Sequence, residues 1–230
     1  MTALETVKPA RARNRRGEGT LLREEILGAA VELLDAAGDE RAVTLRSIAR
    51  RVGISAPSIY PHFPDQPAIM LAVVQREFIA LEAGLRTAME LAADDPRERL
   101  TVVCNAYLDF ASAYPERYRT MFGGLWMPDI VSSSLTAHDL ATLGASAMRV
   151  LVDALRDCVE SGVATSDDVA ADAVALWAGL HGLAHQRAAA PLFPWPDDIA
   201  QRLVRSLAHL TDIAPPSGER NAENGGRVGA

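Results

Sequence analysis

Apolar side chains recur every three or four positions along most of the chain, with polar residues between them. Leu22, Ile26, Ala30 and Leu33 form one such stripe near the N-terminus. This period is typical of an amphipathic helix, and no long segment shows the alternation that indicates a half-buried strand. The pattern therefore predicts an all-α fold of about nine helices.

Capping residues and glycines divide the pattern into elements. Gly38 and Gly53 are expected to stop the first two helices. Four residues whose side chains can cap a helix precede the first four: Thr20, Thr44, Ser55 and Asp65. The expected helices cover residues 20–37, 45–52, 56–63, a long segment from 65, 96–114, 115–122, 136–160, 166–186 and 197–210.

Composition shifts along the chain predict its domain organisation. Residues 1–19 are polar and Arg-rich without periodicity, and we expect a flexible basic arm there. Residues 20–64 hold three short helices with helix-turn-helix spacing, and residues 65–213 hold a larger helical domain. Residues 214–230 are rich in Gly, Pro and Asn without an apolar stripe, which favours disorder.

The segment GISAPSIYPHF, residues 53–63, carries the most specific chemistry. Two short helices joined by Gly-Ile-Ser have the spacing of a helix-turn-helix, whose second helix enters the major groove of DNA. The helix starts at Thr44 and Ser55 present free N–H groups that suit phosphate. Ala56, Pro57 and Ser58 are the candidates to face the bases, and Arg46 is the candidate for the strongest direct base contact. Tyr60 and His62 are candidates to donate uncharged hydrogen bonds to the sugar-phosphate backbone of DNA. An ordinary helical hairpin with a surface Tyr and His is the alternative.

The distribution of charge supports contact with nucleic acid better than the net charge does. The whole chain has a formal net charge of -7, yet residues 41–63 contain four Arg and no acid. A nucleic-acid footprint needs only a local basic face. The segment KPARARNRR at 8–16 is either a second contact in the minor groove or a solvated leader.

Other classes of function find little support. Cys104 and Cys158 lie in apolar helical stretches, which indicates small buried thiols. No secretory leader or membrane span is evident, so we expect a cytoplasmic protein. No catalytic motif is present, which favours a protein that is not an enzyme and has no cofactor. His181 and His185 have a spacing that zinc can use, but no third ligand is apparent, and we expect no metal.

Residues 44–71 resemble the DNA-binding region of the TetR family of bacterial transcription regulators. The matching features are Thr44, Ile48-Ala49, Gly53-Ile54-Ser55, Ile59-Tyr60, His62-Phe63 and a helix that opens near Asp65. The resemblance implies DNA contacts from Thr44, Arg46, Ser55, Ala56, Pro57, Ser58, Tyr60 and His62. Family members usually carry Lys where this chain has Gln66, so Gln66 is expected to contact phosphate without the charge.

The larger domain resembles the WHG type of TetR C-terminal domain. The resemblance rests on PERYRTMF at 115–122 and on Trp177, His181 and Gly182 in a W-x-x-x-H-G pattern. It implies a ligand-binding and dimerisation domain. The candidate ligand-binding residues are Tyr107, Phe110, Met121, Phe122, Trp126, Trp177 and His181, although core packing explains the same apolar spacing.

These observations predict a homodimeric transcription regulator, namely a repressor that a small molecule releases from a palindromic double-stranded DNA operator. The last two helices are expected to form the dimer interface. The sequence does not indicate which face of the eighth helix takes part. The alternative is a helical protein- or ligand-binding module whose DNA-binding domain has no role in sequence-specific regulation.

Overall fold

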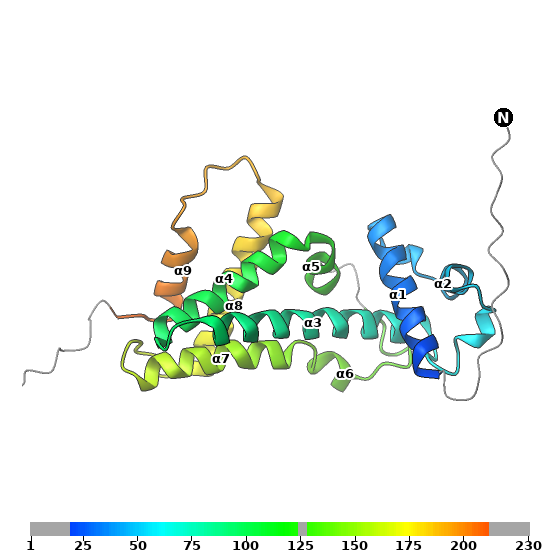
Figure 1. The fold of residues 1–230 in the computed structure, drawn as a ribbon, viewed down its shortest axis with the longest axis horizontal. Helices are drawn as coiled ribbons and strands as arrows, with labels where there is room; N and C mark the ends of the chain where they lie inside the picture. Colours follow the sequence, from blue (N-terminus) through cyan, green and yellow to red (C-terminus); the bar gives the residue numbers. More distant parts are fainter. Residues whose placement is uncertain (1–18, 124–127, 212–230) are drawn as a thin grey trace, which may run out of the picture. The chain divides into compact units, whose positions relative to one another are not determined.

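The computed structural model describes residues 19–123 and 128–211. These ranges contain nine α-helices and two 3-10 helices (Figure 1), which confirms the expected all-α fold. Residues 1–18 of the expected basic arm, Trp126 and the C-terminal tail lie outside the described residues. Among the described helices, none has the combination of length and apolar character needed to cross a membrane.

The described residues group into two compact units, and the first contains the predicted helix-turn-helix. This unit takes the chain up to Leu85 and again from Asp109 to Ala147. Its elements are α1 (Gly19–Ala37), η1 (Glu40–Ala42), α2 (Leu45–Val52), η2 (Ala56–Ser58), most of α3 (Gln66–Leu91), α5 (Pro115–Phe122) and α6 (Ala137–Ala141). Residues from α1, α2, α3 and the segment after η2 form one core, in which Ile26, Ile48, Ile59 and Ile69 are fully buried.

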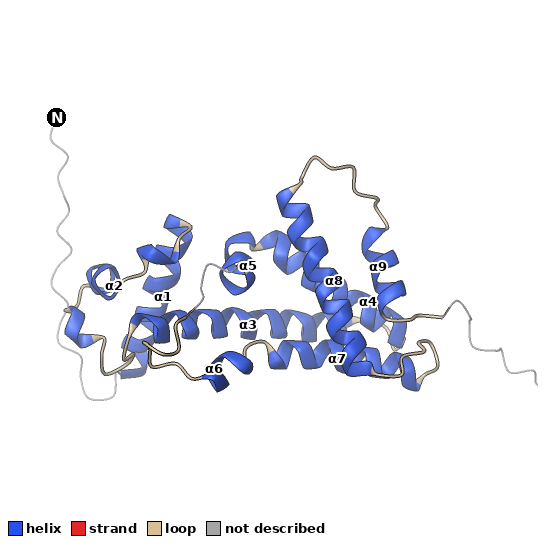
Figure 2. Ribbon diagram, turned by 180° about the vertical axis from the view of Figure 1, so that it is seen from behind, coloured by secondary structure: helices blue, strands red, loops and turns tan. Residues whose placement is uncertain are grey.

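The second unit consists of residues 86–108 and the chain from Met148 onward. It holds most of α4 (Pro96–Ala113) and α7 (Ala145–Glu160), with α8 (Val169–Ala189) and α9 (Ile199–Leu207). Helices α8 and α9 lie side by side in both views (Figures 1 and 2). Leu155, Leu176 and Leu180 are buried in its core. The domain boundaries expected from the sequence stay a prediction.

Some expectations about individual elements are wrong. Thr20 lies inside α1 and does not cap it. The third helix is only a 3-10 turn, Ala56–Ser58, followed by further turns. The helix expected at 136–160 is divided into α6 and α7 at Gly144, whose φ of 73° is left-handed. A Cβ at Gly144 would lie 2.6 Å from the Phe78 ring, so glycine at this position avoids both a clash and backbone strain.

Both cysteines are free and buried, as expected. Burial raises the pKa of the Cys104 thiol to about 12. Burial likewise raises the pKa of Cys158 to about 11. Because the thiolate is the reactive form, neither side chain is suited to nucleophilic chemistry.

Candidate nucleic-acid interface and effector site

The start of α2 is fixed by a reciprocal pair of hydrogen bonds. The Ser47 backbone N–H donates to Thr44 Oγ1 at 3.1 Å, and the Thr44 backbone N–H donates to Ser47 Oγ at 2.8 Å. This capping box satisfies two backbone donors that the helix leaves free. At the other end Gly53 adopts a left-handed φ of 80° and donates to the Ala49 carbonyl at 2.9 Å. The predicted cap at Thr44 and stop at Gly53 are confirmed.

The second segment of the motif is held differently from the expectation. The Ser55 hydroxyl shares a hydrogen bond of 2.8 Å with the Ser58 hydroxyl and does not cap the backbone. Pro57 has no N–H to offer, and the Ser58 N–H already donates to the Ser55 carbonyl at 2.9 Å. The predicted side-chain cap at Ser55 is therefore wrong.

Burial divides the residues of this segment into two faces. Ile59 and Phe63 are buried, and they fix the segment to the core of the first unit. Tyr60 is 56% exposed, and Pro57 is exposed as well. The other predicted DNA contacts are exposed or half-buried: Thr44, Arg46 and Ser55 are exposed, whereas Ala56, Ser58, His62 and Gln66 are half-buried.

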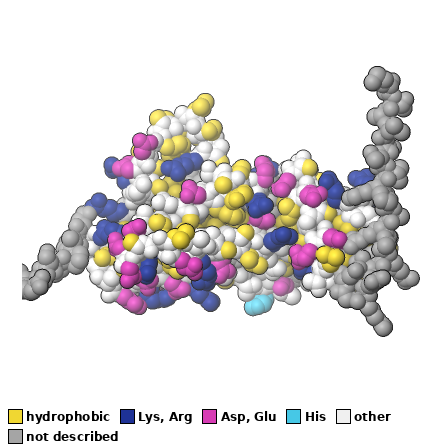
Figure 3. Space-filling view, viewed as in Figure 1, with side chains coloured by type: hydrophobic (Ala, Val, Ile, Leu, Met, Phe, Trp, Pro, Cys, Tyr) yellow, Lys and Arg dark blue, Asp and Glu magenta, His cyan; other side chains and the backbone are white. Residues whose placement is uncertain are grey.

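The basic residues of α2 differ in their pairing. Arg51 Nη1 lies 3.0 Å from Glu32 Oε2 on α1, so its charge is partly neutralised within the chain. Arg46 and Arg50 are exposed and form no ion pair with a described residue. The positive charge available for DNA from α2 is thus concentrated on Arg46 and Arg50. On the face shown in Figure 3, basic and acidic side chains are interspersed.

A groove of about 410 Å³ joins the start of α2 to the start of α3. It brings Thr44 and Gln66 together, both of them predicted phosphate contacts. Asp65 caps α3 as expected, because its Oδ1 accepts from the Ala68 N–H at 2.9 Å. Glu40 also lines the groove, and its buried Oε2 has no hydrogen-bond partner among the described residues. Burial, with Asp39 nearby, raises the pKa of Glu40, whereas Arg41 acts in the opposite direction.

Three of the predicted ligand-binding residues meet in the second unit. Tyr107 Oη lies 3.4 Å from His181 Nδ1, and the Trp177 and His181 rings lie 5.6 Å apart. Burial lowers the pKa of His181, and the neighbouring His185 lowers it further, so the neutral imidazole is favoured. The result is a small aromatic cluster with a few polar atoms, a composition that suits a weakly polar ligand.

The other predicted ligand-binding residues have different surroundings. Phe122 packs against Phe78 and Tyr118 at ring distances of 5.5 and 4.9 Å. Phe110 is buried and lies 5.4 Å from the Tyr114 ring. Met121 is half-buried. In the described ranges no group of three or more potential metal-binding side chains occurs.

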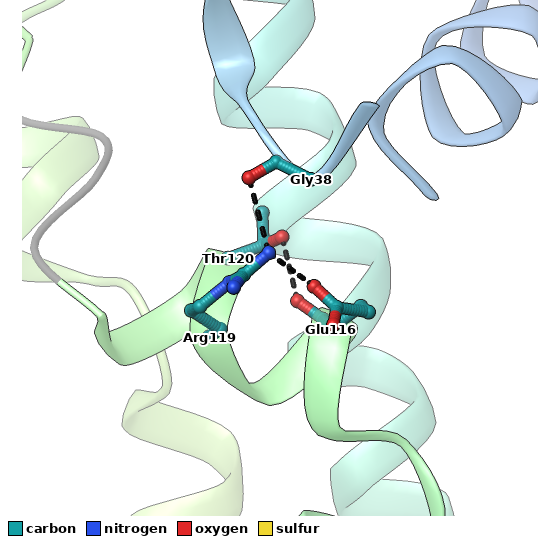
Figure 4. A network of polar contacts seen from close by, with 4 residues as sticks. All are labelled: Gly38, Glu116, Arg119 and Thr120. Atoms are coloured by element: carbon teal, nitrogen blue, oxygen red, sulfur yellow. Dashed lines mark hydrogen bonds and ion pairs between the residues drawn. The ribbon is translucent and has the colours of Figure 1, made fainter. Parts of the chain in front are cut away.

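Sequence reasoning missed a polar connection between α5 and α1. Arg119 Nη2 donates to the Gly38 carbonyl at 3.0 Å, and the same guanidinium pairs with Glu116 on its own helix (Figure 4). The Thr120 hydroxyl donates to the Glu116 carbonyl at 2.9 Å. Next to this network Arg117 Nε lies 3.7 Å from Glu77 Oε2 on α3. No pattern in the sequence links Arg119 to Gly38 or Arg117 to Glu77, and the charges of the arginines and of Glu77 were the only signal of these contacts.

Known families match both parts of the chain. A family profile described as "Bacterial regulatory proteins, tetR family" matches residues 26–73. A second, described as "Tetracyclin repressor-like, C-terminal domain", matches residues 100–210.

Individual relatives agree with these profiles. The HTH-type transcriptional activator FasR of Mycolicibacterium smegmatis is 36% identical over 115 residues, which are 47% of this chain and 50% of the relative. The nucleoid occlusion factor SlmA of Pectobacterium carotovorum is 33% identical over 104 residues, 44% of this chain and 50% of the relative. The chain thus spans about half the length of the curated relatives it matches.

Solved structures extend the similarity over most of the chain. The regulator PfmR of Thermus thermophilus is 25% identical, with a TM-score of 0.53. This match covers 80% of this chain and 94% of that protein.

Proposed function

Because the chain belongs to the TetR family of bacterial regulatory proteins, we propose that it is a DNA-binding transcriptional regulator. The family consists of regulators and not of enzymes, in agreement with the expectation that the chain has no catalytic activity. The observation that carries the proposal is the two-faced segment after Gly53. Buried Ile59 and Phe63 fix it to the core, while Pro57 and Tyr60 remain exposed for DNA.

The residues of the proposed interface have distinct roles. Ala56, Pro57 and Ser58 face the bases, where small side chains suit contact with a thymine methyl, and Arg46 supplies the stronger direct contact. Tyr60, His62, Thr44, Ser55 and Gln66 position the protein on the sugar-phosphate backbone. Gln66 donates a hydrogen bond without charge, so it contributes no counterion release to the salt dependence of binding.

For regulation, we propose repression that a small molecule relieves. The support is the C-terminal profile match together with the Tyr107, Trp177 and His181 cluster, which suits an uncharged or weakly polar effector. The effector has to bind one conformation more tightly than the other. The Mycolicibacterium relative is named an activator, so the transcription assay should be able to detect both an increase and a decrease caused by the protein.

We also propose a homodimer that pairs α8 and α9 with their copies. Leu176, Leu180 and Leu183 are buried within one chain, so this face of α8 is already occupied. Val174 is 50% exposed, and Ala171 and Ala178 on the same side are not buried either. This apolar face is the one we assign to the seam, and sedimentation of the full chain tests the stoichiometry.

Binding to fluorescent fragments of the source genome tests the proposed function. We expect sequence-specific binding that weakens as salt rises. Tyr60→Phe and His62→Ala should weaken all sites evenly, whereas changes at Ala56 or Ser58 should alter sequence preference. Arg156→Gln, on α7, is a control that should leave binding unchanged. If no salt-sensitive, sequence-specific binding to DNA is observed, the alternative of a helical binding module is favoured.

A further inference from the structure

A pocket of about 220 Å³ lies within the first unit, between α1, α3 and α5. We call it the α1–α3–α5 pocket. It is smaller than the roughly 300–1,000 Å³ typical of sites for drug-sized ligands. The residues that line it are Gly28 and Val31 of α1, Arg76, Glu77 and Ala80 of α3, and Arg117 of α5.

Glu77 is the unusual member of the lining. Its side chain is only 5% exposed, and its Oε2 has no hydrogen-bond partner among the described residues. The Arg117 Nε at 3.7 Å is too distant for a hydrogen bond. A buried carboxylate oxygen without a hydrogen bond costs stability that a partner with a donor group would recover.

The guanidinium groups of the two arginines in the pocket also have donors without hydrogen-bond partners among the described residues. Arg76 Nη1 lies 3.6 Å from Glu24 Oε2, again beyond hydrogen-bond distance. Arg117 lies over the Tyr114 ring at 4.9 Å, a contact that leaves its N–H groups available. Neither guanidinium forms a hydrogen bond with a described residue, although each carries five donors.

These groups define the chemistry of a complementary ligand. Two guanidinium groups recognise an anion, and a carboxylate is a small anion that matches the geometry of their paired donors. The unpartnered oxygen of Glu77 requires a hydroxyl or ammonium donor on the same molecule. The pocket volume corresponds to about seven water molecules, which limits the ligand to a similar number of heavy atoms.

We propose that the α1–α3–α5 pocket binds a small carboxylate that also carries a hydroxyl or amino group. Its carboxylate pairs with Arg76 and Arg117, and its donor group satisfies Glu77. This site is separate from the Tyr107, Trp177 and His181 cluster, so the chain holds two sites of different polarity. An effect of this ligand on DNA binding, transmitted through α1, would depend on the proposed function. Binding of the ligand to the pocket does not depend on it.

Calorimetric titration of the full chain without DNA tests the proposal, at constant pH and ionic strength. Lactate is the probe, propionate lacks its hydroxyl, and glycerol lacks its carboxylate. We expect saturable binding of lactate with one site per chain, about tenfold weaker binding of propionate and no binding of glycerol. Equal heats from lactate and from sodium sulfate of the same ionic strength would overturn the proposal, as would the absence of lactate binding.

Glycine substitutions provide a matched pair of variants that remove no charge. A Cβ at Gly28 or at Gly84 would meet no atom within 4 Å, and only Gly28 lines the pocket. Gly28→Leu should abolish lactate binding because its side chain fills the pocket, and Gly84→Leu should preserve it. Lactate binding that survives in Gly28→Leu contradicts the assignment, provided circular dichroism shows both variants folded.

Charge substitutions then identify the partners of the ligand. Arg76→Gln and Arg117→Gln should each weaken lactate binding about tenfold or more. Binding that is unchanged in both variants would also overturn the proposal. Since titration measures the ligand directly, a protein that binds lactate but no operator would retain this inference and lose the proposed function.

Discussion

The guanidinium of Arg119 donates a hydrogen bond of 3.0 Å to the carbonyl of Gly38, 81 residues earlier in the chain. Gly38 directly follows the last residue of α1, where helix carbonyls lack partners and attract positive charge. Arg119 lies on α5, and Arg117 of the same helix approaches Glu77 on α3. Through two arginines α5 is therefore connected to both helices that support the helix-turn-helix.

Arg119→Gln is expected to loosen the end of α1. The variant loses a charge-assisted hydrogen bond at an exposed position, which contributes about 0.5–1 kcal/mol. Hydrogen exchange of the amides near Gly38 should become faster, with only a small loss of global stability by urea denaturation.

Arg156→Gln is the matched control for this effect. Arg156 pairs with Asp153 in the same i, i+3 arrangement that Arg119 has with Glu116, and both partners lie on one helix. Exchange near Gly38 should stay at the wild-type rate in this variant. Equal exchange rates in the two variants would show that the contact with Gly38 contributes nothing.

Replacing the two predicted caps should have unequal effects. Thr44→Ala removes a hydroxyl that accepts from a backbone N–H, and we expect a loss of about 1–2 kcal/mol in the free energy of unfolding. Ser55→Ala removes only a bond to another hydroxyl, so we expect a loss of about a few tenths of a kcal/mol. Urea denaturation measures both, and similar losses would contradict the described backbone of the second segment.

Gly144→Ala should destabilise the protein more than Gly162→Ala. Both glycines are left-handed, with φ of 73° and 76°, so both variants incur about 1–2 kcal/mol of backbone strain. Only the Cβ at Gly144 would collide with Phe78, which adds about 1–3 kcal/mol of overpacking. Thermal denaturation of the two variants measures the difference, and Phe78→Leu should reduce it.

Glu77 should make stability depend on pH in a defined direction. Burial raises its pKa above the ordinary value of 4.5, with Asp35 adding to the rise and Arg117 and Arg76 opposing it. The stability that the neutral carboxyl contributes is therefore complete below pH 4.5 and is lost as pH rises through the folded-state pKa.

Glu77→Gln should flatten this dependence. Compared with wild type, the variant should gain relative stability as pH rises from 4.5 toward neutrality, because it carries no buried charge to desolvate. Melting temperatures at several pH values measure the difference. A variant at Glu77 with the wild-type profile would show that its carboxyl is solvated.

The elements that could be predicted are those whose partners lie within one helical turn. Thr44 and Ser47 are three residues apart and satisfy one another, as the spacing indicates. Ser55 failed under the same rule because Pro57 removes one donor and the 3-10 turn uses the next. The break at Gly144 was missed because one glycine costs a helix only about 1 kcal/mol, which periodicity tolerates.

The sequence by itself determined the helical fold, the cap and stop of α2, and the resemblance to the TetR family. These features depend on apolar periodicity and on bonds between residues close in the chain, which a linear pattern contains. Tertiary structure alone decided the Arg119–Gly38 bond, the burial of Glu77 and the meeting of Tyr107 with His181. Their partners are separated by 40 or more residues, so their contacts depend on how the helices pack and not on local spacing.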